Sequence, residues 1–156
     1  MKCTALMLGL ALALLQPLAA RAADTAAPVL LGRWLTEPRD GIIEITRLGD
    51  GSYQGRIIGG NAPGRLDVKN PDASRRQQLL LGQIIVLGMH EDGANAWSGG
   101  TIYDPDSGRT YKCHLEVLDQ DHLKVRGFIG VSLLGRSQTW TRYTGTSLEL
   151  SAPAAR

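Results

Sequence analysis

The chain has 156 residues, with 17 Lys and Arg against 15 Asp and Glu, and a formal net charge of +2. This length suits one domain with a real core, and the weak net charge gives no composition argument for nucleic-acid binding, which normally needs a basic stripe. Glycine is abundant, with 19 residues, and helix-forming runs are nearly absent, which favours short strands and tight turns.

The first 22 residues predict a secretory signal peptide. Lys2 opens a short basic region, residues 5–15 are almost wholly apolar, and residues 20–22 (Ala-Arg-Ala) have the small-x-small pattern that signal peptidase accepts. The apolar run is too short to span a bilayer and no later run is longer, so no transmembrane anchor is expected. We therefore predict a signal peptide at 1–22, a leader at 23–28, and a periplasmic or secreted protein.

Cleavage after Ala22 changes the charge and the cysteine content. Lys2 and Arg21 leave and no acid does, so the mature chain is formally neutral. Cys3 leaves too, so Cys113 remains alone and no disulfide within the chain is expected. A lone cysteine on a strand is more often a small buried hydrophobe than a reactive thiol, so stability must come from packing.

Alternating polar and apolar residues predict eight strands along the mature chain. Short turns rich in Asp and Gly separate most of them, and such turns join antiparallel neighbours. The sequence therefore predicts an all-β fold: an eight-stranded antiparallel up-and-down β-barrel over residues 29–146, closed so that no sheet edge is left. A flexible tail is expected at 147–156. The expected strands are 29–36, 41–48, 52–58, 83–90, 96–103, 110–118, 122–129 and 137–144.

One connection, residues 59–81, differs from the others. It contains the only good helix-starting signal of the chain, with Asp72 placed to cap one or two turns after it. A crossover of this length is more than a simple connector needs. Two interpretations stay open: the segment is a lid or functional loop, or its helix plugs one end of the barrel.

Two spacings near the end of the chain resemble a phosphate loop and a serine-hydrolase elbow, but neither fits its motif. Residues 130–137 fit the spacing of a phosphate loop with arginine in place of lysine, but that motif needs a helix to begin at once. Residues 138–144 are instead β-branched, aromatic and alternating, which favours a strand. Residues 130–135 also approach the Gly-x-Ser-x-Gly motif of serine hydrolases, but their second glycine, Gly135, comes one residue too late.

The sequence gives little support for a metal site or a reactive cysteine. Cys113 and His114 are neighbours on an expected strand and so point to opposite faces. With His90 and His122 they show no zinc-binding spacing. The turn at 104–108 has alternating acids but lacks the later glutamate of a calcium loop. We therefore expect no metal, no cofactor and no enzymatic activity.

The two ends of the mature chain suggest how the barrel closes. Gly32 and Trp34 lie in the first expected strand, and Trp140 and Arg142 lie in the last. First and last strands are neighbours in a closed barrel, so Arg142 can stack on the indole of Trp34. By the period of two, Gln138 shares a face with Trp140 and Arg142.

This pairing of Gly32-x-Trp34 with a late Arg142 resembles the lipocalin and fatty-acid-binding (calycin) superfamily. A wider set of motifs resembles the bacterial exported family called Domain of Unknown Function twenty-one forty-seven, although Arg109 stands where that family often has lysine. The resemblance implies a periplasmic, lipocalin-like barrel and carries over no catalytic residue. These motifs lie at residues 32–34, 40–45, 67–72, 80–82, 97–105, 108–111, 123–128 and 135–142.

An eight-stranded barrel has an interior just wide enough for packed side chains or one small ligand. Our leading hypothesis is an exported barrel that binds a small apolar, amphipathic or lipid-like ligand. We expect wall residues at Trp97, Tyr103 and Tyr111, with Arg126 as an anchor for a carboxylate or phosphate head. The alternative is a non-enzymatic envelope interaction protein with a solid barrel, whose 59–81 loop docks a protein partner.

Overall fold

The structure is a computed structural model that describes residues 29–131, 133 and 135–150. The expected signal peptide and the expected leader lie outside these residues. No helix within this range is long and apolar enough to cross a membrane. The strands are β1 (Gly32–Leu35), β2 (Gly41–Arg47), β3 (Tyr53–Gly60), β4 (Ile84–Glu91), β5 (Ala96–Ser98), β6 (Thr101–Asp104), β7 (Arg109–Val117), β8 (His122–Phe128) and β9 (Gly135–Arg142).

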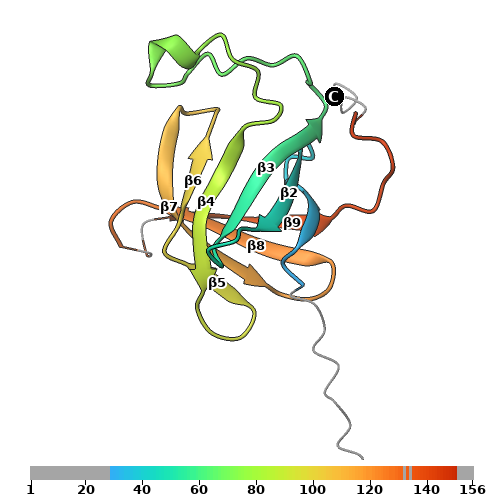
Figure 1. Ribbon diagram of the computed structural model, residues 1–156, viewed down its shortest axis with the longest axis vertical. Helices are drawn as coiled ribbons and strands as arrows, with labels where there is room; N and C mark the ends of the chain where they lie inside the picture. The colour runs from blue at the N-terminus through green and yellow to red at the C-terminus, as the bar shows by residue number, and fades with distance from the viewer. Residues whose placement is uncertain (1–28, 132, 134, 151–156) are drawn as a thin grey trace, which may run out of the picture.

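The strands form one closed antiparallel barrel, as the sequence predicts (Figure 1). β1 lies between β2 and β9, and the pairing of β3 with β4 closes the ring. β5 and β6 both pair with β4 and with β7, so they are two parts of one strand and the barrel has eight strand positions.

Gly99 and Gly100 cause the interruption between β5 and β6. Gly99 has φ +80°, a conformation that side chains disfavour. A side chain at Gly100 would collide with the carbonyl oxygen of Leu87 and the sulfur of Met89 on β4. Two glycines therefore let the strand bend while it stays close to its neighbour.

The last strand also shows that residues 130–137 are not a phosphate loop. Residues 135–142 are strand β9, paired with β8 from Gly135 to Thr141. No helix follows the glycines, so the N–H groups and dipole that would hold a phosphate are missing from this segment.

The 59–81 loop arches over one end of the barrel, beside the ends of β3, β4 and β6 (Figure 1). Asp72 caps its helical turn, accepting a hydrogen bond from the backbone N–H of Ser74 at 2.9 Å. The helix is only one 3₁₀ turn (Ala73–Arg75), and none of its residues is buried. It therefore does not plug the barrel, because it has no apolar face to insert.

Part of the expected flexible tail is paired with the barrel. The backbone N–H of Gly60 donates to the carbonyl of Leu148, and the N–H of Leu150 donates to the carbonyl of Gly60. A side chain at Gly59 would collide with the Leu148 carbonyl. Residues 147–150 thus depart from the prediction because a bare backbone offers them a docking edge; the rest of the tail lies outside the described residues.

Candidate ligand-binding cavity

The two ends of the barrel differ. A cavity of about 600 Å³ opens at the end where β1, β3, β6 and β8 finish, which is the end covered by the 59–81 loop. Its volume lies within the usual range of small-molecule sites. The inner part of its wall is apolar, and charged residues lie around its rim. The inner wall includes Ile43, Ile57, Ile85, Ile102, Val125 and Trp140, and the rim includes Asp40, Arg65, Asp104, Asp106 and Arg136.

The opposite end is closed by stacking between the first and last strands. Trp34 and Arg142 are directly paired in the register of β1 and β9, and the guanidinium carbon lies 3.9 Å from the centroid of the indole. Gly32 has φ +115°, and a side chain there would approach Arg142 at 3.1 Å. Gly32, Trp34 and Arg142 therefore lie together at this end of the barrel.

Arg142 also fastens the chain that precedes β1. Its guanidinium donates to the carbonyls of Val29 and Leu31, and its Nε donates to the carbonyl of Gln120 at 2.9 Å. Trp34 Nε1 donates to the carbonyl of Leu30 at 2.9 Å. The Leu30 side chain is completely buried as a result, and this segment covers the closed end.

Trp140 has a role between the two ends. It is only 2% exposed, it belongs to the core cluster, and it also lines the cavity. Its Nε1 donates to Oε1 of Gln138 at 2.9 Å. Trp140 is therefore the floor of the cavity, and its predicted part in barrel closure stays a prediction.

Tyr103 and Tyr111 both line the cavity, as the hypothesis of an aromatic wall expects. Tyr103 lies on β6, and its hydroxyl donates to Oδ1 of Asp67 at 2.6 Å. Burial, followed by this hydrogen bond to a carboxylate, raises the pKa of Tyr103 to about 12. The hydroxyl is therefore a donor at neutral pH. The hydroxyl of Tyr111 lies 3.3 Å from Ser107 Oγ in the turn between β6 and β7.

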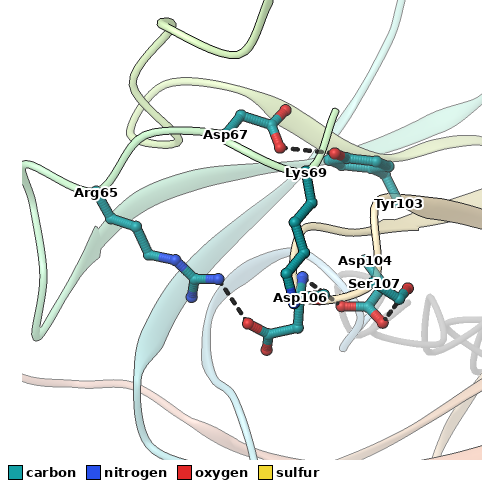
Figure 2. A network of polar contacts seen from close by, with 7 residues as sticks. All are labelled: Arg65, Asp67, Lys69, Tyr103, Asp104, Asp106 and Ser107. Atoms are coloured by element: carbon teal, nitrogen blue, oxygen red, sulfur yellow. Dashed lines mark hydrogen bonds and ion pairs between the residues drawn. The ribbon is translucent and has the colours of Figure 1, made fainter. Parts of the chain in front are cut away.

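A group of polar contacts fastens the 59–81 loop to this side of the barrel, and we call it the clasp (Figure 2). Asp67 is 1% exposed, and its second oxygen accepts from the amide of Asn70 at 2.7 Å. Arg65 pairs with Asp106 at 2.5 Å, and Lys69 donates to the Asp106 carbonyl. The turn between β6 and β7 thus holds the loop beside the cavity mouth.

Trp97 does not line the cavity. It lies on β5 near the closed end, is 4% exposed, and packs edge-on against Tyr53 with ring centroids 5.9 Å apart. Its indole nitrogen has no hydrogen-bond acceptor within the described part of the chain. The sequence could not separate core aromatics from cavity aromatics, because both face inward.

Arg126 does not line the cavity either. Leu123 and Val125 are its buried neighbours on β8, so the period of two directs Arg126 outward. Its Nη1 donates to Oγ of Ser137 on β9 at 2.9 Å. The proposed head-group anchor therefore lies on the outer face of the barrel.

On β9, Arg136 lines the cavity. It lies two residues before Gln138 and four before Trp140 on β9, on the same inner face. The strand period, counted back from Trp140, could have identified it in the sequence. Opposite it in the register stands Gly127 of β8, which leaves the space around Arg136 open.

The remaining chemistry-bearing residues do not converge. Cys113 is 2% exposed, and burial raises the pKa of its thiol to about 12, as expected for a small core residue. Among the described residues, no group of three or more His, Cys, Asp or Glu side chains could hold a metal ion. His122 pairs with Asp119 in an exposed turn.

Comparison with known proteins places this barrel in a family. The model of the family described as "Uncharacterized protein conserved in bacteria (DUF2147)" matches residues 32–142, which span the barrel from β1 to β9. The chain belongs to this family. The DUF2147 match includes Gly32, Trp34, Trp140, Arg142 and both cavity tyrosines. No curated protein matches the chain.

A solved structure supports the same fold for this DUF2147 protein. The chain is similar to a protein of the human pathogen Helicobacter pylori, HP1028, which is described as belonging to the lipocalin family. The TM-score is 0.66 at 18% sequence identity, over 74% of this chain and 83% of that one. The similarity shows a lipocalin-like barrel.

Proposed function

We propose that this protein is an exported binding protein that holds a small apolar or amphipathic ligand in its cavity, without converting it. The observation that carries the proposal is the cavity of about 600 Å³ with an apolar floor and a charged rim. A pocket of this kind buries most of a small ligand, while a few polar groups at its rim orient that ligand.

The distribution of packing in the barrel supports binding over a purely structural role. Trp34, Tyr53 and Trp97 fill the closed end, whereas the inner face of β8 tapers from Leu123 to Gly127 towards the mouth. The space is therefore produced by small inner residues in an otherwise well-packed barrel. The 59–81 loop is held to its own barrel by the clasp, so docking of a separate protein through this loop is the weaker alternative.

Ligand binding is tested with a variant that fills the cavity. Gly127→Leu adds a side chain inside the cavity, and its Cβ would make only ordinary contacts, at 3.4 Å from Ile102 and Tyr111. Thr139→Leu places the same side chain on an exposed position of β9 as the control. A neutral naphthylamine dye is titrated by fluorescence. We expect Gly127→Leu to lose binding and Thr139→Leu to keep it; equal binding by both variants overturns the cavity as the site.

The natural ligand is sought in the protein taken from its native compartment. Gentle purification, organic extraction and mass spectrometry should recover a small apolar or amphipathic compound from wild type and not from Gly127→Leu. An extract identical for the two variants contradicts the proposal. Crosslinking through the 59–81 loop, with a specific protein captured and lost on shortening the loop, would favour the alternative of an envelope interaction protein.

Export is part of the proposal and has its own test. Amino-terminal sequencing of the protein from the periplasm or medium should begin at Ala23. An uncleaved chain retained in the cytoplasm contradicts it.

A further inference from the structure

The inner face of β9 carries hydrogen-bond donors for which the described part of the chain supplies no acceptor. Among the described residues, no carboxylate pairs with Arg136 and no hydrogen bond holds its guanidinium, although the side chain lines the cavity. An arginine offers a rigid, planar set of five donors that suits carboxylate and phosphate oxygens.

Gln138 adds a second donor on the same face. The indole nitrogen of Trp140 can only donate, so the oxygen of the Gln138 amide must be the atom that receives it at 2.9 Å. The amide nitrogen is then directed away from Trp140, and no described residue accepts from it. Gln138 lies two positions after Arg136 on the strand, which places their backbones about 7 Å apart. Both side chains can therefore bind one head group.

The acids of the rim lie on other segments, where each accepts a hydrogen bond, and none of them pairs with Arg136. Asp40 accepts from Thr36 Oγ1 at 2.6 Å in the turn between β1 and β2. Asp104 accepts from the backbone of Asp106 at 2.9 Å in the turn after β6. Asp106 itself is paired with Arg65. Asp40 and Asp104 keep their negative charges, but no acid among the described residues is ion-paired with Arg136, so the charge nearest to Gln138 on β9 is positive.

We propose that the ligand is a single-chain amphiphile with one anionic head, a carboxylate or a phosphate, whose head binds Arg136 and Gln138 at the mouth and whose apolar chain points towards Trp140. This inference rests on the proposed function and adds the charge and the orientation of the ligand. The polar group lies at the open end because Arg136 is exposed there, and the chain lies inward because the floor is apolar.

The experiment compares probes that share one chain and differ in the head: dodecanoate, monododecyl phosphate, dodecanol and dodecyltrimethylammonium. Binding is followed by calorimetry and by the intrinsic tryptophan fluorescence, to which Trp140 contributes together with Trp34 and Trp97. We expect at least one anion to bind about tenfold more tightly than dodecanol, the effect of a hydrogen bond to a charged group, and the cation to bind least. The ratio between dodecanoate and monododecyl phosphate distinguishes the two head groups.

Three variants assign the effect to Arg136. Arg136→Gln should reduce the preference for anions over dodecanol to within about threefold, and Arg136→Lys should keep part of it. Arg126→Gln makes the same charge change on the outer face of the neighbouring strand and should leave the preference unchanged. Thermal unfolding of each variant verifies that the barrel remains folded.

The outcomes separate this inference from the function on which it rests. Equal affinity of wild type for dodecanol and both anions overturns the anionic head while leaving apolar ligand binding intact. A preference that survives in Arg136→Gln, or disappears in Arg126→Gln, overturns the role of Arg136. Failure of all four probes to bind counts against both.

Discussion

The closed end and the open end of this barrel are made from the same strands, yet they differ in what those strands turn inward. On β8 the inner residues are Leu123 and Val125 and then Gly127. On β9, read in the same direction, apolar Trp140 gives way to Gln138 and Arg136. One end is consequently packed, and the other is hollow and polar at its rim.

This difference shows that the cavity is set by side-chain size rather than by the number of strands. An eight-stranded barrel is just wide enough to be filled by large side chains or to hold one ligand. Here both solutions occur within one barrel, with Trp140 at the boundary. Stability should therefore depend mainly on the closed end and ligand binding mainly on the open end.

The largest expected effect is at Trp34. Trp34→Ala removes a completely buried indole, and with it the stacking surface for Arg142 and the hydrogen bond to Leu30. Such truncations cost about 3–5 kcal/mol. Urea denaturation should show this loss. Tyr111→Ala at the open end is the counterpart and should cost clearly less; equal losses would contradict the division between the ends.

Arg142→Ala should have the second largest effect. It removes the stack on Trp34 and the hydrogen bonds to the carbonyls of Val29, Leu31 and Gln120. We expect a loss of about 2–3 kcal/mol in the free energy of unfolding. Ligand affinity should not change at temperatures where the variant is folded. Unchanged thermal stability would count against closure by this residue.

A pair of glycines gives a matched comparison of the two regions. A side chain at Gly55 would lie 3.1 Å from Ile43 and Val86, which are almost fully buried and cannot move aside. Gly55→Ala should therefore destabilise the barrel by about 1–2 kcal/mol. Gly127→Ala meets only ordinary contacts and should leave stability unchanged or slightly higher. Calorimetric melting of both variants decides the matter.

The clasp should contribute less to global stability than the closed end. Tyr103→Phe leaves one oxygen of the buried Asp67 without its partner, at a cost of about 1–2 kcal/mol. Hydrogen exchange of residues 59–81 should quicken more than that of β8 and β9. Tyr111→Phe loses only an exposed contact with Ser107 and should not quicken it.

The smallest effect is a pH dependence in the alkaline range. The pKa of Tyr103 is raised from 10.0 to about 12 in the fold. The contribution of its neutral hydroxyl is fully present below pH 10 and is lost as the pH rises towards 12. Tyr53 also has a raised pKa, so the difference between wild type and Tyr103→Phe isolates Tyr103. Parallel stability curves for the two proteins would contradict the assignment.

Most of the fold could be predicted from the sequence because its signals are local. Alternation identified each strand, and turns rich in Asp and Gly identified the antiparallel hairpins. The stacking of Arg142 on Trp34 could be predicted because the first and last strands of a closed barrel are neighbours. The break at Gly99 and Gly100 was not predicted, because it depends on how closely β4 approaches.

The site was only partly predictable. Inward alternation could place Tyr103 and Tyr111 inside the barrel, but it could not tell which inner residues lie in the packed half, and so it included Trp97. The strand period places Arg126 on the outer face and Arg136 on the inner face, so the sequence alone could have identified Arg136 as an arginine of the cavity wall. The bond from Tyr103 to Asp67 joins residues 36 positions apart, and no local pattern indicates such a contact.

The burial of Cys113 has a practical consequence. Its thiol is 2% exposed and has a pKa of about 12, so thiol-directed reagents should react with it very slowly in the folded protein. A cysteine introduced on the exposed surface of the 59–81 loop of the mature chain could therefore carry a fluorescent or spin label without removal of the native residue. Movement of that loop during ligand entry then becomes directly observable.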